Sequence, residues 1–370
     1  MRLTGAILPD AMIELFRRYP ALAETVPHTL LGDWPTPVGR LRHLERDNQI
    51  YIKNDGASGP LYGGNKVRKL EFLLAAARAQ GCREVLTFGV AGSNHALATA
   101  LYAESLGLRC ISILTPQRNA RYVATNLLAA STTNAELHHY GSEASALHGA
   151  RFQILRHRRA TGIAPMVIAG GGSSPTGTVG FVNAAFELAA QIESGQLPEP
   201  HKLYVALGTM GTAVGLLLGL RAAGLATEIV PVRVVRDSIA NLQVMRRLHD
   251  QTNRLLHERD PDFPLLPFEV DCIRHDQFGK HYAEFTPAGM AAKKLLAESE
   301  DLALEGTYTG KTMAALLADS DAGKLAGENV LYWHTYNSHS LQDRIQGLDY
   351  HALPPDFHRY FERPVQPLDD

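Results

Sequence analysis

A lysine beside two glycines is the residue best suited to chemistry in this chain. Lys66 follows Gly63-Gly64-Asn65, and an apolar pattern with helical spacing continues to about Ala79. At a helix start, the positive end of the helix dipole disfavours the ammonium form of a lysine. Burial would lower its pKa further and make the amine a nucleophile that condenses with carbonyl groups. An exposed lysine after a flexible turn fits the same residues, so other segments must decide.

Two loops between an expected strand and an expected helix offer groups that bind anions. Ser93-Asn94-His95 opens the helix expected over residues 94–105; one polar residue caps a helix, and three also suit a carboxylate or a phenolate oxygen. Gly208-Thr209-Met210-Gly211-Thr212 follows the strand expected over residues 203–206. Its backbone N–H groups, threonine hydroxyls and helix N-terminus suit a phosphate, although the dinucleotide pattern G-x-G-x-x-G is absent. A simple cap and an unliganded turn remain the alternatives.

A fourth loop places a tyrosine at a helix start. The segment Gly306–Thr312 resembles a P-loop, but three residues rather than four separate its first glycine from the Gly-Lys pair, so a nucleotide site is not expected. Tyr308 beside Thr309 suits proton transfer on a bound substrate. A buried tyrosine with a threonine cap is the structural alternative.

Strand and helix patterns alternate along the chain. Strands are expected at residues 51–53, 85–88, 110–114, 166–168, 203–206, 229–235 and 330–333, with helices at 66–79, 94–105 and 177–192. Such alternation predicts an α/β fold with parallel sheets covered by helices on both faces. Ligands bind in such folds where strand C-termini meet helix N-termini, which is where the four loops lie.

Composition excludes several classes of function. The chain has 370 residues, which suggests two domains, and a net charge of −2, which does not indicate a nucleic-acid partner. Three widely spaced cysteines, Cys82, Cys110 and Cys272, form no disulfide framework and fit a reducing, cytoplasmic setting. No apolar run is long enough to cross a membrane, and no signal peptide is recognisable. The acidic, proline-rich tail from Leu353 is expected to be a surface extension.

Metal and hydrolase chemistry are not indicated. The 16 histidines include no H-x-x-x-H pair, so no metal site is predicted. The G-x-S-x-G pattern of serine hydrolases is also absent.

Taken together, these motifs resemble the 1-aminocyclopropane-1-carboxylate (ACC) deaminase and D-cysteine desulfhydrase family, whose cofactor is pyridoxal phosphate. The matching segments are Pro35-Thr36-Pro37, Tyr51–Asp55, Gly63–Leu73, Ser93-Asn94-His95, Gly170–Ser173, Gly177 with Gly180 and Phe181, Gly208–Thr212 and Tyr308–Lys311. The resemblance implies the two-domain tryptophan synthase β-like fold (fold type II). Residues 1–57 and 169–370 would form the larger, cofactor-binding domain and residues 58–168 a smaller inserted α/β domain. It also implies a homodimer.

The resemblance assigns a role to each matched position. Lys66 would hold the cofactor as a Schiff base, Asn94 would bind its phenolic oxygen, and Thr309 would face its pyridine nitrogen. The loop of Gly208, Thr209, Met210, Gly211 and Thr212 would hold its phosphate. Ser93 and His95 would hold the substrate carboxylate, with Ser93 also among the catalytic candidates, and Tyr308 would act as a catalytic acid, base or nucleophile.

Two segments depart from the family pattern. A Tyr-Gly pair of the family reads Phe278-Gly279 here, so its proton-transfer role is lost or moves to Tyr282. The family segment His-Thr-Gly-Gly reads His334-Thr335-Tyr336-Asn337, which adds bulk and polarity near the cofactor. Phe278 and Thr335 are expected to contact the substrate, and both departures leave room for a substrate other than D-cysteine.

The residue at position 309 bears on the chemistry. Pyridoxal phosphate acidifies the Cα proton of an amino acid most strongly when its ring nitrogen is protonated. Thr309 is neutral and cannot compensate that charge, which suits loss of a good β-leaving group better than opening of a cyclopropane ring. Thr309 and His95 match the desulfhydrase branch of the family, since the ring-opening branch carries Glu and Gln there.

The prediction is therefore a lyase acting on a small amino acid by α,β-elimination, giving a 2-oxo acid and ammonia. An ACC deaminase and a non-catalytic protein that binds pyridoxal phosphate or an amino acid are the alternatives.

Overall fold

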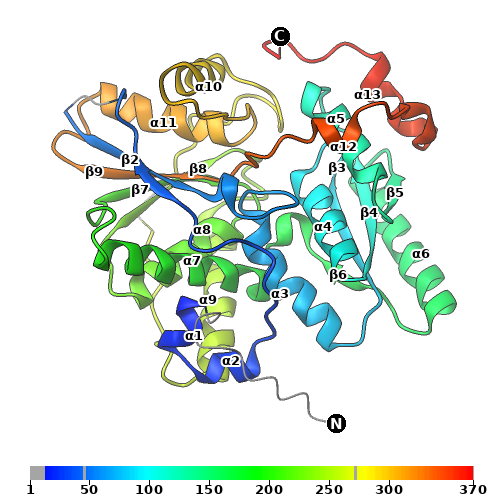
Figure 1. Ribbon diagram of the computed structural model, residues 1–370, viewed down its shortest axis with the longest axis horizontal. Coiled ribbons are helices and arrows are strands. Elements are labelled where there is room, and N and C mark those ends of the chain that lie inside the picture. The colour runs from blue at the N-terminus through cyan, green and yellow to red at the C-terminus, as the bar shows by residue number, and fades with distance from the viewer. Residues whose placement is uncertain (1–12, 45–46, 271–272, 370) are drawn as a thin grey trace.

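The computed structural model describes residues 13–44, 47–270 and 273–369 (Figure 1). Its strands are β1 (Val38–Arg40), β2 (Gln49–Asn54), β3 (Glu84–Val90), β4 (Arg109–Thr115), β5 (Glu136–His139), β6 (Met166–Ile168), β7 (Lys202–Leu207), β8 (Glu228–Arg233) and β9 (Asn329–His334). Its α-helices are α1 (Glu14–Arg18), α2 (Ala21–Thr25), α3 (Lys66–Ala79), α4 (Asn94–Ser105), α5 (Arg121–Ser131), α6 (Glu143–Thr161), α7 (Pro175–Glu193), α8 (Gly211–Ala222), α9 (Leu242–Arg259), α10 (Pro287–Glu300), α11 (Thr309–Asp321), α12 (Gln342–Ile345) and α13 (Arg359–Glu362). The expected strands and helices are confirmed, and α3 begins at Lys66 as predicted.

The larger sheet has five strands in the order β1-β2-β9-β7-β8. All its pairs are parallel except β1 with β2. Helices α7, α8 and α9 cover one face, and α10 and α11 cover the other (Figure 1). Its central strands are buried on both faces, as the apolar run Leu203–Leu207 predicts.

The smaller sheet has four parallel strands in the order β5-β4-β3-β6. Helix α4 packs on one face, and α6 packs on the other through contacts among Ile111, Ile113 and Ala146. The proposed division of the chain at residues 57–58 and 168–169 puts each sheet in a separate domain.

A buried ion network holds the start of α3 against the larger sheet. Arg68, which is 1% exposed, contacts Asp55 at 2.8 Å and Glu187 at 2.9 Å. Lys53 also donates to Glu187, and the Trp333 indole donates to Asp55. Burial opposes ionisation of Glu187, but Arg68 and Lys53 outweigh it and hold its pKa at about 2. Because buried charges are costly unless paired, these contacts fix α3 in one position.

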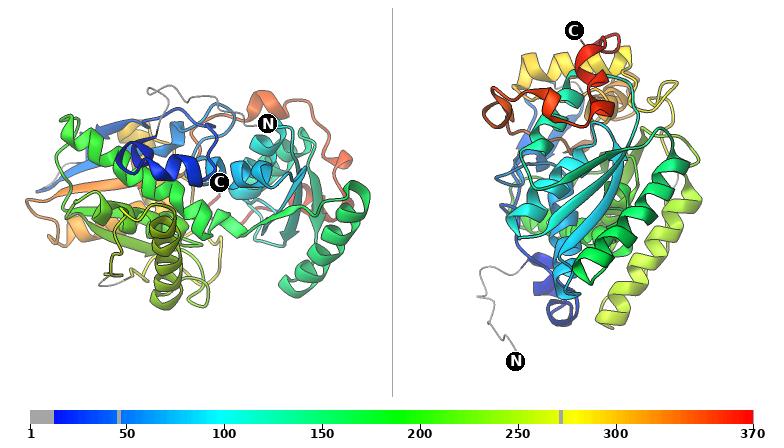
Figure 2. Two further views of the ribbon diagram at one scale, coloured as in Figure 1. Left: turned by 90° about the horizontal axis from the view of Figure 1, so that it is seen from below. Right: turned by 90° about the vertical axis from the view of Figure 1, so that its right-hand side faces the viewer.

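The C-terminal segment packs on the smaller sheet's side of the molecule, so the prediction of a surface extension was wrong. Phe357 and Tyr360 are buried against residues of α5, and the segment lies beside that helix (Figure 2). Asp369 accepts a hydrogen bond of 2.6 Å from the Arg121 backbone N–H. Buried aromatic side chains outweigh the polar composition of the tail. Within the described residues, no helix is both long and apolar enough to span a lipid bilayer.

Candidate active site

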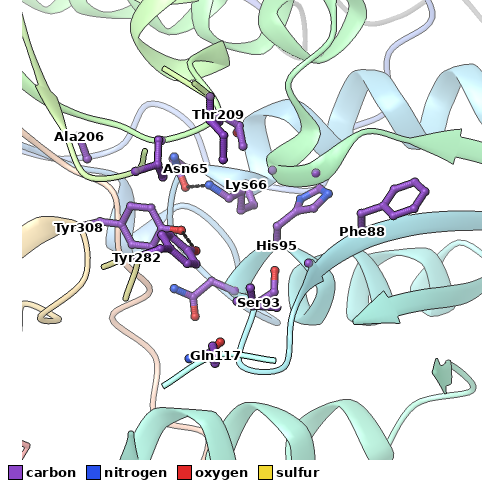
Figure 3. A pocket seen from close by; sticks show the side chains of 18 of the residues that line it. Asn65, Lys66, Phe88, Ser93, His95, Gln117, Ala206, Thr209, Tyr282 and Tyr308 are labelled. Carbon is purple, nitrogen blue, oxygen red and sulfur yellow. Dashed lines mark hydrogen bonds between the residues drawn. The ribbon is translucent and has the colours of Figure 1, made fainter. Parts of the chain in front are cut away.

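A cavity of about 680 Å³ collects the loops that the sequence singled out. Its walls come from the ends of strands β3, β7 and β9 and the starts of helices α3, α4 and α8 (Figure 3). The two sheets each contribute one side, so the cavity lies where strand C-termini meet helix N-termini. Its volume is within the range of small-molecule and cofactor sites.

Lys66 projects into this cavity from the first turn of α3. Its Nζ donates to Oδ1 of Asn65 at 2.9 Å, and Asn65 in turn donates to Oγ1 of Thr212 at 3.0 Å. Burial lowers the pKa of Lys66 to about 8, although Glu305 acts in the opposite direction. The neutral amine, which a nucleophile or a base requires, is therefore far more populated near neutral pH than in an ordinary lysine.

Ser93, Asn94 and His95 line the cavity at the start of α4. The Ser93 hydroxyl caps the helix by accepting a hydrogen bond from Ala96 N–H at 3.2 Å, so the capping alternative also holds. The hydroxyl proton of Ser93 is still available to donate to a ligand. Asn94 Oδ1 accepts from the Tyr62 hydroxyl and from Asn126 Nδ2, which fixes the amide in one orientation.

His95 is buried and uncharged at neutral pH. Burial, with the positive charges of Lys66 and Lys69, lowers its pKa well below the usual value. Its Nε2 lies 2.9 Å from Thr87 Oγ1, while Nδ1 has no hydrogen-bond partner among the described residues. A buried polar atom without a partner is costly, so Nδ1 is suited to contact a bound ligand.

The loop before α8 forms a tight cradle. Gly208, Thr209, Met210 and Thr212 line the cavity, and Gly211 begins the helix. A Cβ added at Gly211 would come within 2.8 Å of Ser173 Oγ and 3.0 Å of Lys69 Nζ, so only glycine leaves this space open. The cradle combines hydroxyl groups, a nearby lysine and a helix N-terminus, which together suit a phosphate group.

Tyr308 lines the cavity and contacts Tyr282. The sequence analysis named Tyr282 only as the residue that could take over the proton-transfer role lost at Phe278. The Tyr308 hydroxyl lies 2.5 Å from the hydroxyl of Tyr282 (Figure 3). Burial and the neighbouring Tyr282 raise the pKa of Tyr308 well above its usual value. Tyr308 therefore keeps its proton at neutral pH and is suited to act as an acid.

Phe278 does not reach the cavity. Its carbonyl accepts from Lys311 Nζ at 2.7 Å, and its ring lies 5.1 Å from the Arg233 guanidinium. Tyr282 lines the cavity instead, and Ala283 after it has a φ of 59°, a conformation that favours glycine. We interpret Tyr282-Ala283 as the counterpart of the family's Tyr-Gly pair, which the sequence alone had matched to Phe278-Gly279.

Thr309 is also not among the residues that line the cavity, whereas Glu305 is. The Glu305 carboxylate accepts the backbone N–H groups of Thr307, Tyr308 and Thr309 at 2.6–2.7 Å. The Thr309 hydroxyl is within hydrogen-bond distance of both the backbone and the side chain of Glu305. The Thr309 side chain is neutral, but the buried carboxylate of Glu305 lies next to it.

The segment after β9 closes one wall. Thr335, Tyr336 and Asn337 line the cavity. Tyr336 and Asn337 therefore add bulk and polarity to this wall, as the sequence predicts. Asn337 Oδ1 accepts from Gly63 N–H at 2.6 Å, which ties this wall to the loop before Lys66. Asn65, Tyr62 and Glu305 were not predicted as site residues, because each becomes recognisable only through the group that it contacts.

Comparisons with known proteins decide the family. The family model for pyridoxal-phosphate dependent enzymes matches residues 29–335. The chain belongs to this family. The D-cysteine desulfhydrase of Salmonella newport is 34% identical over 320 residues, covering 83% of this chain and 93% of that protein. The D-cysteine desulfhydrase of Serratia proteamaculans is 32% identical over 318 residues, covering 83% and 92%. A solved structure of an ACC deaminase homologue, 29% identical, superimposes with a TM-score of 0.75 over 92% of this chain and 99% of that one.

This pyridoxal-phosphate-dependent enzyme therefore has the fold type II architecture that the motifs predicted. The residues present fit the cofactor. A half-buried amine of lowered pKa suits its aldehyde, the open cradle at Gly211 suits its phosphate, and the fixed amide of Asn94 suits a phenolic oxygen. These residue roles remain predictions, which the experiments below address.

Proposed function

We propose that this chain is a lyase that removes the β-substituent of a small D-amino acid by α,β-elimination, with D-cysteine as the parent substrate. The observation that carries the proposal is the placement of Lys66 and Tyr308 on one cavity, with pKa values shifted in opposite directions. The lysine has a pKa of about 8 and the tyrosine a pKa well above 10, so one suits a base and the other an acid. Pairs of groups with separated pKa values are typical of acid–base sites.

The cofactor, when bound, withdraws electrons from Cα of the amino acid and acidifies its proton. The residues around it supply the other functions. Ser93 donates its hydroxyl to the substrate carboxylate. Neutral His95, with its proton on Nδ1 and its Nε2 accepting from the Thr87 hydroxyl, donates to the same group. Lys66 takes the Cα proton with its neutral amine. Tyr308 gives its proton to the departing sulfur, with Tyr282 holding its hydroxyl in place.

The products follow from the balance of atoms. The Cα–H and Cβ–S bonds break, the sulfur leaves as a thiol, and the resulting enamine is hydrolysed by water to a 2-oxo acid and ammonia. For D-cysteine these products are sulfide, pyruvate and ammonia. Relatives named D-cysteine desulfhydrase at 32–34% identity support this substrate.

The experiment is a product assay on the purified holoenzyme with D-cysteine, L-cysteine and ACC. Sulfide and pyruvate from D-cysteine would support the proposal, and L-cysteine serves as the stereochemical control. ACC deaminase activity is the second candidate function, because the chain resembles the solved ACC deaminase homologue. Release of 2-oxobutanoate from ACC, instead of products from D-cysteine, would favour that function. Spectral change without any product would indicate a binding protein.

The setting and assembly are also proposals. Cys82 and Cys110 are free thiols, which agrees with the reducing, cytoplasmic setting proposed from the sequence, and Cys272 lies outside the described residues. A homodimer is proposed from the family resemblance. Light scattering after size-exclusion chromatography tests it, and a mass near the 40.4 kDa of one chain would contradict it.

A further inference from the structure

The cavity that holds Lys66 continues into an apolar arm. The arm is lined by Phe88, Ile113, Ala146, Leu147, Val235 and Ile239, which come from strands β3 and β4, helix α6 and the segment after β8. In the view of Figure 3, His95 lies between Lys66 and Phe88, so Phe88 lies beyond His95 as seen from the reacting amine. The sulfur of cysteine alone would leave this space unfilled.

The inner and outer parts of the arm differ in exposure. Ile113 and Ala146 are buried in the packing between the smaller sheet and α6. Leu147 on α6 is 57% exposed and Ile239 in the segment after β8 is 37% exposed, and both line the cavity. Large apolar side chains at a rim gain free energy when an apolar ligand covers them, by about 25 cal/mol for each Å² removed from water.

The charges at the rim are already paired with each other. Arg236 Nη2 lies 2.5 Å from Glu143 Oε1, and this ion pair joins the segment after β8 to the start of α6. Arg236 and Glu143 together bring no net charge to the rim, so a second carboxylate gains little there. The apolar lining therefore favours an apolar substituent over an acidic one.

We infer that the substrates preferred by this site are S-substituted cysteines whose sulfur carries an apolar alkyl or aryl group. The group occupies the apolar arm, with Phe88 beside its inner part and Leu147 and Ile239 over its outer part. This inference rests on the elimination reaction proposed above and names the leaving group. The Cα–H and Cβ–S bonds break, the thiolate takes a proton to leave as an apolar thiol, and water converts the enamine to pyruvate and ammonia.

The first experiment compares turnover by the holoenzyme. The kcat/KM for pyruvate release is measured with D-cysteine and with S-methyl-, S-propyl- and S-benzyl-D-cysteine. We expect S-benzyl-D-cysteine to exceed S-methyl-D-cysteine by about tenfold or more, the lower end of what an apolar pocket gives for added apolar atoms. Turnover of D-cysteine with no gain along the series would overturn the inference and leave the elimination reaction standing.

The second experiment measures binding without elimination. D-2-Amino-5-phenylpentanoic acid and D-norvaline carry no leaving group, and both are titrated into the holoenzyme by calorimetry. We expect the phenyl compound to bind about tenfold more tightly or better. If the phenyl compound binds more tightly but no substrate is turned over, the result would reject the proposed reaction and support binding of an apolar group in the arm. Equal affinities would overturn the arm whatever the turnover.

Two matched variants locate the effect. Leu147→Asp places a charge in the arm, whereas Leu155→Asp makes the same change on the outer face of α6, where Leu155 is 54% exposed and does not line the cavity. Both positions are exposed, so both variants should fold. We expect Leu147→Asp to remove most of the binding preference and Leu155→Asp to retain it. Equal preference in both variants would contradict the location.

Discussion

The hydroxyl groups of Tyr282 and Tyr308 lie 2.5 Å apart inside the cavity, on two segments separated by 26 residues. Tyr308 stands at the N-terminus of α11, and Tyr282 precedes α10. The shared hydrogen bond orients the Tyr308 hydroxyl, and both phenols are half-buried, with raised pKa values. An acid held in this way needs no reorganisation when the leaving group departs.

The Tyr282→Phe change removes the orienting hydroxyl. We expect kcat with D-cysteine to fall about tenfold or more while KM changes little, because Tyr282 acts through Tyr308. The Tyr308→Phe change should cost more, about a hundredfold or more, as loss of a general acid does. Steady-state kinetics of both variants checks this. Tyr51→Phe is the control, since the Tyr51 hydroxyl contacts only exposed Gln49. A Tyr282→Phe effect confined to KM would contradict the orienting role.

The Lys66→Ala change should remove covalent attachment of the cofactor. We expect the variant to fold, because the lysine lies at the cavity rather than in a packed core, but to lose the cofactor on dialysis and to show no detectable turnover. Absorption spectra after dialysis check this, with Lys294→Ala as the control at an exposed lysine. Retention of a covalently bound cofactor would show that another amine, with Lys69 the nearest choice, holds it.

Cofactor loading should depend on pH in a defined way. Burial lowers the pKa of Lys66 to about 8, and only the neutral amine attacks an aldehyde. The rate at which apoprotein takes up pyridoxal phosphate should therefore rise with pH and level off above about 8. Stopped-flow absorbance measures this rate. A plateau reached only near pH 10.5, the ordinary lysine value, would mean that the amine is not desolvated.

The ion network around Arg68 should dominate the response to mutation outside the site. Arg68→Met leaves Asp55 and Glu187 buried without their main partner, so we expect a loss of about 3–5 kcal/mol in the free energy of unfolding. Arg17→Met removes an exposed surface pair with Glu14 and should cost about 0–1 kcal/mol. Urea unfolding compares the two. Equal losses would show that the buried network adds nothing beyond a surface pair.

The same network predicts acid sensitivity. Glu187 has a folded pKa of about 2 against an ordinary value of 4.5, so its contribution is present above pH 4.5 and is lost as the pH falls towards 2. The free energy of unfolding should decrease over that window. Urea midpoints measured between pH 5 and pH 2 check this, and the decrease should be shallower in Arg68→Met, where Glu187 no longer gains from Arg68.

Much of the candidate site could be predicted because its signals are local in the sequence. Lys66 follows glycines and starts a helix, and Ser93 stands where the next helix needs a cap, so both could be placed from neighbouring residues alone. The phosphate cradle at Gly208–Thr212 depends on the same strand-to-helix geometry. Short apolar runs predicted the strands, and the alternation of these runs with helices predicted parallel sheets, because helical crossovers join parallel strands.

Other features follow only from contacts between distant segments. Tyr282 rather than Phe278 enters the cavity because the chain before α10 turns at Ala283, and no local pattern distinguishes the two rings. Asn337 meets Gly63 across the fold, and Glu305 rather than Thr309 faces the cavity. The sequence by itself determined which loops carry the reactive groups. Tertiary structure alone decided which of those groups meet, and how burial shifts the pKa of Lys66, because both depend on packing between the two sheets.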